Sequence, residues 1–192
     1  MTSSRARQVL LDAVVGYASH HGVGDLSLRE LARAVGTSHR MLLYHFASKE
    51  ELLVAIVEAN EDAQRASLAD AVARADGTPL DVLRQAWEQL ASPAMAPSER
   101  LFFELYGQAL QGRPGTTALL DGIVTSWTEP AAEVLAAHGV APADAAAEAR
   151  LHLAVVRGLL LDLLATGDRV GVGRAMELFL ARSATAGHRS AH

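Results

Sequence analysis

Two short helical segments lie between Ser27 and Phe46, and capping residues and a glycine mark where each segment begins or ends. Ser27 and Glu30 form the S-x-x-E pattern of a capping box, in which serine and glutamate satisfy free amide groups at the start of a helix. Gly36 then ends that helix, and Ser38 can cap a second one that runs through Phe46. These capping and stop residues predict two short helices joined by a tight turn.

The spacing within these helices is that of a DNA-binding helix-turn-helix. Two short helices that cross steeply need a small residue where they touch, which is Ala32, and a residue tolerant of positive φ in the turn, which is Gly36. They also need apolar anchors, which Leu31, Val35 and Leu42 supply. Matches of this kind also arise by chance in helical proteins, so the flanking sequence has to decide.

The rest of the chain also favours helices. Alanine and leucine supply 37 and 28 of the 192 residues, whereas isoleucine supplies 2, which weighs against an all-β protein or a large parallel sheet. Ser48 opens a second capping box and a long helix to about Ala75, and Pro130 is expected to kink or split a later one. Further helices are predicted at 79–91, 98–111, 117–137, 143–166 and 170–184. We therefore expect an all-α protein of about nine helices, with an N-terminal three-helix helix-turn-helix domain followed by a helical bundle.

Several classes of function are disfavoured. The absence of cysteine excludes disulfides, thiol catalysis and cysteine-based zinc sites. The G-x-S-x-G elbow, the P-loop and the H-E-x-x-H zinc motif are all missing, so we expect no enzyme, no metal and no cofactor. Arg157 and Asp162 interrupt the longest apolar runs, and the first residues show no signal-peptide core. These features predict a soluble cytoplasmic protein with no membrane partner.

Charge is divided unevenly along the chain. The net charge of −5 argues against a surface coated with basic groups, yet residues 1–51 have a balance of +1 and residues 52–192 a balance of −6. The division is either random scatter or the mark of a small module that faces an anionic partner and is carried by an acidic body.

The flanking sequence resembles the N-terminal domain of the TetR family of transcriptional repressors over about residues 8–58. Three segments carry the resemblance: SLRELARAVG, TSHRMLLYHF and SKEELL. This chain has Leu43 where the family usually has tyrosine, whereas Tyr44 and His45 match the family's aromatic and histidine positions. The resemblance implies a DNA-binding domain at 1–50 and an effector-binding and dimerisation domain at 51–186.

The helix that begins after Ser38 is the candidate reader of DNA. Arg40 lies near its start, where an arginine can reach guanine, and Leu43 can touch a thymine methyl group. Hydroxyls at Thr37 and Ser38 suit phosphate oxygens at a helix N-terminus. The complete set of candidate DNA-binding residues is Ser27, Arg29, Thr37, Ser38, His39, Arg40, Leu43, Tyr44, His45 and Lys49.

Tyr44, His45 and Lys49 are candidate phosphate ligands, as the resemblance also implies. Each side chain has an alternative role: Arg40 can be a solvated charge, His45 a packed histidine, Lys49 a surface lysine, and Leu43 a partly buried residue.

The last two predicted helices are candidates for a dimer interface. The segment 143–166 is apolar around most of its circumference, which predicts burial on two sides. The resemblance implies a four-helix interface between two chains, and the alternative is that these helices only fill the core of one chain. The candidate interface residues are Leu151, Val155, Gly158, Leu159, Met176, Phe179 and Leu180.

Aromatic residues concentrate in the middle of the chain, where the family has its effector pocket. The candidate effector-binding residues are Trp87, Phe102, Phe103, Tyr106, Trp127 and Arg157, although an aromatic stripe is more often core than ligand site. The sequence thus predicts a homodimeric transcriptional repressor that a small-molecule effector releases from a palindromic operator on double-stranded DNA. The alternative is an all-α small-molecule binding module, or a small enzyme, that does not bind DNA.

Overall fold

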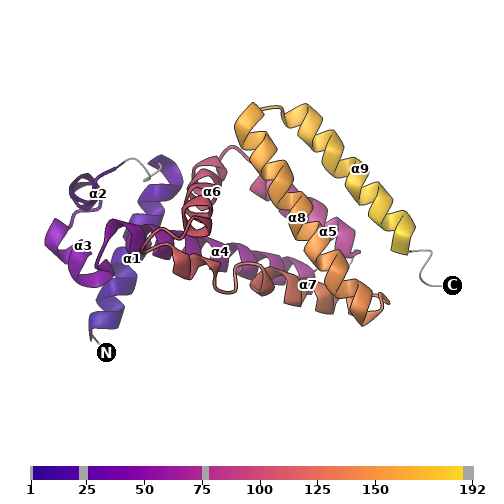
Figure 1. Ribbon diagram of the computed structural model, residues 1–192, viewed down its shortest axis with the longest axis horizontal. Coiled ribbons are helices and arrows are strands. Elements are labelled where there is room, and N and C mark those ends of the chain that lie inside the picture. The colour runs from indigo at the N-terminus through magenta and orange to yellow at the C-terminus, as the bar shows by residue number, and fades with distance from the viewer. Residues whose placement is uncertain (1, 22–25, 75–77, 188–192) are drawn as a thin grey trace. The chain divides into compact units, whose positions relative to one another are not determined.

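The computed structural model describes residues 2–21, 26–74 and 78–187, and these residues form an all-α protein without strands (Figure 1). The helices are α1 Thr2–His21, α2 Leu28–Ala34, α3 His39–Phe46, α4 Lys49–Arg74, α5 Pro79–Leu90, α6 Ala96–Leu110, the 3-10 helix η1 Thr117–Leu120, α7 Thr125–Ala137, α8 Pro142–Thr166 and α9 Arg169–Gly187. The predicted fold class and helix count are confirmed for the described residues.

The chain folds into two compact units. One comprises residues 1–64 and 93–121, and the other comprises residues 65–92 and 122–192. Helix α4 contributes its first sixteen residues to the first unit and the rest to the second. This structural division differs from the functional boundary predicted at residue 50, because α6 and η1 belong with the N-terminal helices.

The start of α2 confirms the predicted capping box. Ser27 Oγ accepts a hydrogen bond from the Glu30 amide at 3.3 Å, and the Glu30 carboxylate accepts one from the Ser27 amide at 2.8 Å. The turn after α2 takes Gly36 at φ +72°, a conformation that side chains disfavour. The two short predicted helices are therefore present with the expected turn between them.

The core of the first unit is continuous with the start of α4. All six residues from Leu52 to Val57 are buried, so this part of α4 has no exposed face. Val14 of α1, Leu31 of α2 and Leu42 of α3 are likewise fully covered. Because α4 follows α3 after only Ala47 and Ser48, this buried segment anchors the helix before it.

The helix predicted at 117–137 is split, but not at Pro130. Pro130 lies inside α7, and the break comes earlier, between η1 and α7, where Gly122 takes φ +73°. Pro130, the sixth residue of α7, removes one amide donor, yet the helix continues past it to Ala137. The positive φ at Gly122 is the stronger interruption.

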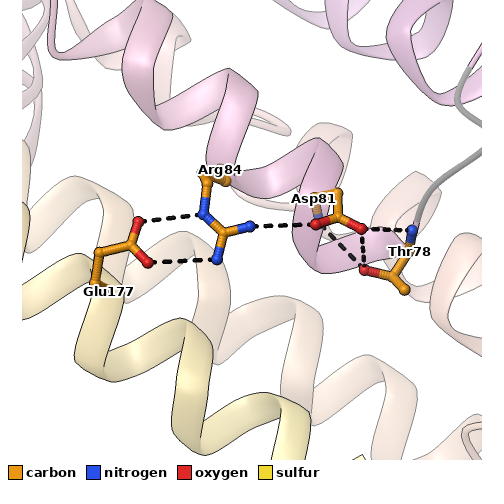
Figure 2. A network of polar contacts seen from close by, with 4 residues as sticks. All are labelled: Thr78, Asp81, Arg84 and Glu177. Atoms are coloured by element: carbon orange, nitrogen blue, oxygen red, sulfur yellow. Dashed lines mark hydrogen bonds and ion pairs between the residues drawn. The ribbon is translucent and has the colours of Figure 1, made fainter.

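The second unit contains α5, α7, α8 and α9, and a polar network joins two of them (Figure 2). Arg84 of α5 donates from Nε and Nη2 to the two carboxylate oxygens of Glu177 on α9, at 3.2 and 3.3 Å. Arg84 Nη1 also donates to Asp81, whose other oxygen accepts from the amide and hydroxyl of the N-cap residue Thr78. Through Asp81 and Arg84, the N-terminal cap of α5 is therefore connected to Glu177 on α9.

Helices α8 and α9 lie side by side within this unit (Figure 1). Their inner faces are buried, at Val156 and Leu160 on α8 and at Val172 and Met176 on α9.

None of the helices in the described ranges has the length and hydropathy needed to cross a bilayer. Gly22, which the sequence offers as the stop of the first helix, lies outside the described residues.

Replacing Gly36 by alanine is expected to destabilise the fold by about 1 kcal/mol, because alanine resists the positive φ even where space is open. The matched control is Gly16→Ala in α1, where φ is negative and nothing lies within 4 Å of the added Cβ. That control should instead stabilise the protein by about 0.5–1 kcal/mol. Urea unfolding measures both changes, and a shift of the same sign in the two variants would contradict the assignment of the turn.

Candidate nucleic-acid interface

The second short helix, α3, begins with a well-formed cap. Ser38 has extended backbone angles, and its hydroxyl accepts a hydrogen bond from the Met41 amide at 3.2 Å. The amide of Thr37 donates to Ala32 at 2.8 Å, which closes the turn onto the preceding helix. Residues 37 and 38 therefore lie at the N-terminus of α3, as the sequence predicts, where a partial positive charge favours anions.

One side of α3 is buried and the other is open. Leu42 and Phe46, one helical turn apart, are buried, as predicted. On the opposite side Arg40 is exposed and Tyr44 exposes 71% of its surface. Because α2 packs against α3 within the first unit, α3 is held with this polar and aromatic face outward.

Two apolar residues flank the exposed face. Leu43 exposes 38% of its surface and Met41 exposes 42%. The candidate set omits Met41, although its position could have been inferred: once Leu42 and Phe46 point inward, Met41 projects about 100° from Leu42 around the helix. Leu43 and Met41 border the polar face on its two sides, where the side chains of a helix in the major groove can contact thymine methyl groups.

The end of α3 is aromatic. The rings of Tyr44 and His45 lie 4.9 Å apart at 76°, and those of His45 and Phe46 lie 6.4 Å apart at 64°. His45 is half-buried, as is His39 in the first turn. His45 is thus partly packed against its neighbours and partly open to solvent.

Lys49 begins α4, directly after the turn at Ala47 and Ser48. The Ser48 hydroxyl accepts a hydrogen bond from the Glu51 amide at 3.0 Å, so Ser48 caps α4 as predicted. Lys49 is half-buried, and its positive charge is among the groups that lower the pKa of Glu30 on α2. Lys49 therefore lies near the capping box of α2 as well as the end of α3.

The capping box itself limits what Ser27 can do. The Ser27 hydroxyl donates its one proton to the Glu30 carboxylate at 2.7 Å and accepts from the Glu30 amide, so a phosphate could accept from this hydroxyl only by displacing the glutamate. Arg29, two residues later, is exposed. Of the ten candidate DNA-binding residues, those on α3 and in its cap share one short helix, and Ser27, Arg29 and Lys49 lie at the starts of its two neighbours.

The comparisons with known proteins show which family this arrangement resembles. Residues 10–56 match the family described as bacterial regulatory proteins, tetR family. This N-terminal segment is therefore similar to the DNA-binding segment of TetR-family regulators.

One curated relative and two solved structures are also similar to this chain. The HTH-type transcriptional regulator AcrR of Shigella flexneri is 32% identical over 83 residues, which are 43% of this chain and 39% of that protein. A TetR family member from Streptomyces coelicolor A3, SCO1917, is 27% identical with a TM-score of 0.63, over 92% of this chain and 96% of that one. The multidrug binding protein EbrR, solved in complex with imidazole, is 25% identical with a TM-score of 0.63, over 93% and 89% of the two chains. The similarity in fold thus spans nearly the whole chain, whereas the curated relative matches over about two-fifths of its length.

The aromatic residues predicted to surround a TetR-family effector pocket fall in both units. In the first unit the Phe102 ring lies 5.2 Å from that of Phe103 and 5.5 Å from that of Tyr106, on one side of α6. In the second unit Trp87 is buried on α5, and the Trp127 ring on α7 lies 5.6 Å beneath the guanidinium of Arg65.

The predicted polar effector ligand, Arg157, donates from Nη2 to the carbonyl oxygen of Ile123 at 2.8 Å within the second unit. Among the described residues, no cluster of three or more histidine, aspartate or glutamate side chains is arranged to hold a metal ion.

The seven predicted interface residues fall into three groups according to how much of each side chain is exposed. Met176 and Leu180 are covered within the chain's own core, on the inner face of α9. Val155, Leu159 and Phe179 are half-buried, whereas Leu151 and Gly158 are exposed. The candidate set omits two exposed leucines, Leu161 on α8 and Leu178 on α9. Because both helices are apolar on more than one side, the sequence pattern alone could not single out these two leucines as exposed.

The capping box of α2 makes a pH-dependent contribution to stability. Hydrogen bonds from the Ser27 hydroxyl and amide, aided by the charges of Arg33 and Lys49, lower the pKa of Glu30 below its usual value. A carboxyl group with a lowered pKa in the folded state stabilises the fold fully above its unfolded-state pKa, and this contribution is lost as the pH falls through the folded-state pKa.

Glu30→Gln is therefore expected to make the free energy of unfolding depend less steeply on pH between about 5 and 3. Urea unfolding at a series of pH values measures this dependence. Glu104→Gln is the control, since it removes one carboxylate of the same unit without touching a helix cap. An unchanged pH dependence in Glu30→Gln would show that the capping box does not contribute in this way.

Proposed function

We propose that the chain is a ligand-responsive transcriptional repressor that binds a palindromic operator as a homodimer and is released by a small-molecule effector. The observation that carries the proposal is the exposed face of α3, where Arg40 and Tyr44 project from a capped helix whose opposite side is buried. A short helix held in this way can enter the major groove of DNA, which is wide enough for an α-helix.

The residues of this face sort into two kinds of contact. Arg40, Met41 and Leu43 are among the first five residues of α3, where the residues of a recognition helix meet base edges. Arginine pairs with guanine through two hydrogen bonds, and apolar side chains contact thymine methyl groups. Tyr44, His45 and Lys49 come later and suit phosphate oxygens, which position the protein without reading sequence.

The outer face of α8 supports the proposed homodimer. Leu151 and Leu161 expose 55% and 52% of their surfaces, and the small residues Ala154 and Gly158 are exposed on the same side. On α9, Leu178 is exposed on the side opposite the buried Met176. Apolar surface of this kind on adjacent helices is best covered by a second copy, because a two-fold dimer pairs each patch with itself.

A dimer of this kind would also set the spacing of the DNA site. Two recognition helices related by a two-fold axis contact successive major grooves on one side of the duplex, about 34–36 Å apart. The operator is therefore proposed to be palindromic, with half-sites centred about one helical turn apart. A protein that acts on such DNA would work in the cytoplasm, as the sequence predicts.

The aromatic residues of α6 support an apolar or amphipathic effector. Phe103 and Tyr106 are half-buried beside the buried Phe102, so their rings can serve either packing or binding. EbrR, described as a multidrug binding protein, has been solved with imidazole. By linkage, an effector can weaken operator binding only by its differential affinity for the two states, typically 1–3 kcal/mol.

The route from effector to DNA is proposed to run through α4. In the segment that follows α6, a Cβ added to Gly115 would lie 3.0 Å from the Glu50 Cβ, and Arg113 Nη2 lies 3.9 Å from the Glu50 carboxylate. The segment after α6 thus touches the first turn of α4, directly after α3. A shift of α6 on effector binding would tilt α4 and change the separation of the two recognition helices.

The rival function is an all-α binding module, or a small enzyme, in which the helix-turn-helix is only structural. A gel-shift titration against random duplexes at two salt concentrations separates the two functions. Salt-sensitive binding supports the repressor, because release of counterions from DNA makes such binding weaken as salt rises. A protein that binds no duplex at either salt concentration would support the rival.

Arg40 and Lys49 should respond differently to substitution. Arg40→Ala is expected to cost about 1–3 kcal/mol on the preferred duplex and to relax selection at one base position. Lys49→Ala should weaken binding to all duplexes about equally and lower the salt slope by about one. Fluorescence anisotropy measures both effects. Equal losses on every duplex for Arg40→Ala, or an unchanged salt slope for Lys49→Ala, would show that the role of that residue is misassigned.

The proposed interface predicts that Leu151→Lys weakens the dimer at least about 100-fold, because the interface would bury an unpaired charge. Sedimentation equilibrium measures the dissociation constant. Leu110→Lys is the matched control, since Leu110 is another highly exposed leucine but lies at the end of α6. A dimer insensitive to Leu151→Lys, or one that Leu110→Lys disrupts equally, would place the interface elsewhere.

A further inference from the structure

The C-terminal end of α3 is held by a contact that the proposed function leaves unexplained. Phe46, the last residue of α3, is buried, and the guanidinium of Arg7 on α1 lies over its ring at 4.7 Å from the centroid. Arg7 is otherwise on the exposed side of α1. An arginine that stacks on an aromatic face is attracted by the ring quadrupole and also covers apolar surface with its flat guanidinium.

Arg7 also acts on α4. Partial burial raises the pKa of Glu58, the charge of Asp62 raises it further, and the charge of Arg7 opposes both effects. Arg7 is therefore close enough to influence a carboxylate on α4 while its guanidinium covers the last residue of α3. The Arg7 side chain of α1 thus interacts with both helices that flank the α3–α4 turn: it stacks on Phe46 of α3 and influences the charge of Glu58 on α4.

That turn needs support. Ala47, between Phe46 and Ser48, takes φ +53°, a conformation unfavourable for a residue with a Cβ, so the surrounding structure must hold it. The burial of Phe46 and its stacking with Arg7 fix the residue directly before this strained position.

We infer that Arg7 is a positioning residue for DNA recognition: by stacking on Phe46 it sets the angle at which α3 presents Arg40 and Tyr44. The inference rests on the proposed function. Base contacts require side chains placed to within about 0.5 Å, so a small tilt of α3 would weaken them more than it weakens the tolerant attraction between basic groups and phosphates. Loss of Arg7 should therefore reduce the preference for one sequence over others, more than it reduces binding to DNA in general.

The competing role for Arg7 is a direct phosphate contact, and the two roles predict different measurements. The test uses the full-length protein, the duplex that binds most tightly among those recovered from a random pool, and a duplex of scrambled sequence. If Arg7 positions α3, Arg7→Gln should bind the selected duplex about 3- to 10-fold more weakly, with affinity and salt slope on the scrambled duplex unchanged. Equal weakening on both duplexes, with the salt slope lower by about one, would identify a phosphate contact and overturn the inference.

Arg5→Gln is the matched control, because it removes the same charge from the same helix, two residues away. It should leave the ratio of the two affinities unchanged. A fall in this ratio as large as that in Arg7→Gln would overturn the inference by tracing the effect to charge alone.

Hydrogen exchange in the absence of DNA provides a second readout. Arg7→Gln should increase exchange of the Ala47 amide, which donates to the Leu43 carbonyl at 3.0 Å, by about 3- to 10-fold. The Val35 amide of the α2 end, bonded to Leu31, should be unaffected. Unchanged exchange at Ala47, or faster exchange with an unchanged affinity ratio, would overturn the positioning role.

If the wild-type protein binds no duplex, the proposed function fails. If the wild-type protein binds DNA but Arg7→Gln leaves the ratio of the two affinities unchanged, this inference alone is overturned.

Discussion

The burial of six consecutive residues at the start of α4, Leu52 to Val57, is the constraint on which the rest of the candidate site depends. A helix covered on every side cannot rotate or slide without breaking its packing, because protein interiors are close-packed. Only Ala47 and Ser48 separate α4 from α3, so the anchored helix limits where α3 can lie. Leu42 and Phe46 then fix the rotation of α3 about its own axis, and its polar face is left outward. The proposed recognition surface is therefore a consequence of core packing on both sides of a two-residue turn.

The same anchoring explains how a distant event could reach DNA. A side chain cannot be added at Gly115 without moving Glu50, so the segment after α6 and the first turn of α4 are in direct contact. The aromatic residues of α6 lie on the same helix that leads into this segment. Because Leu52 to Val57 are packed too tightly to deform locally, displacement at the start of α4 is proposed to move this buried segment as a unit. Coupling of this kind needs only a helix with two alternative positions, each favoured by a different ligand.

Much of this site could be predicted from the sequence, because its signals are local. The capping box at Ser27, the positive φ at Gly36 and the inward Leu42 follow from spacing alone, and the structure bears them out. Contacts between distant residues left no such signal: neither the stacking of Arg7 on Phe46 nor the contact of Gly115 with α4 is visible in any periodicity. In α8 and α9 apolar residues occur on both faces, so the pattern could not separate Met176, which the chain buries itself, from Leu178, which it leaves exposed. The sequence also offered Pro130 as a place where its helix could split, but α7 continues through Pro130 and the break comes earlier, at the positive φ of Gly122.

The central claim is that a dimer of this chain presents two copies of α3 to DNA, and selection of bound sequences from a random duplex pool tests it most directly. The account predicts enrichment of a palindrome whose half-sites are centred about one helical turn apart, at 10–10.5 base pairs. Arg40→Ala should then relax one symmetric pair of positions in that palindrome. Recovery of sequences without palindromic symmetry would contradict the proposed dimer, and failure to enrich any sequence would contradict DNA recognition by α3.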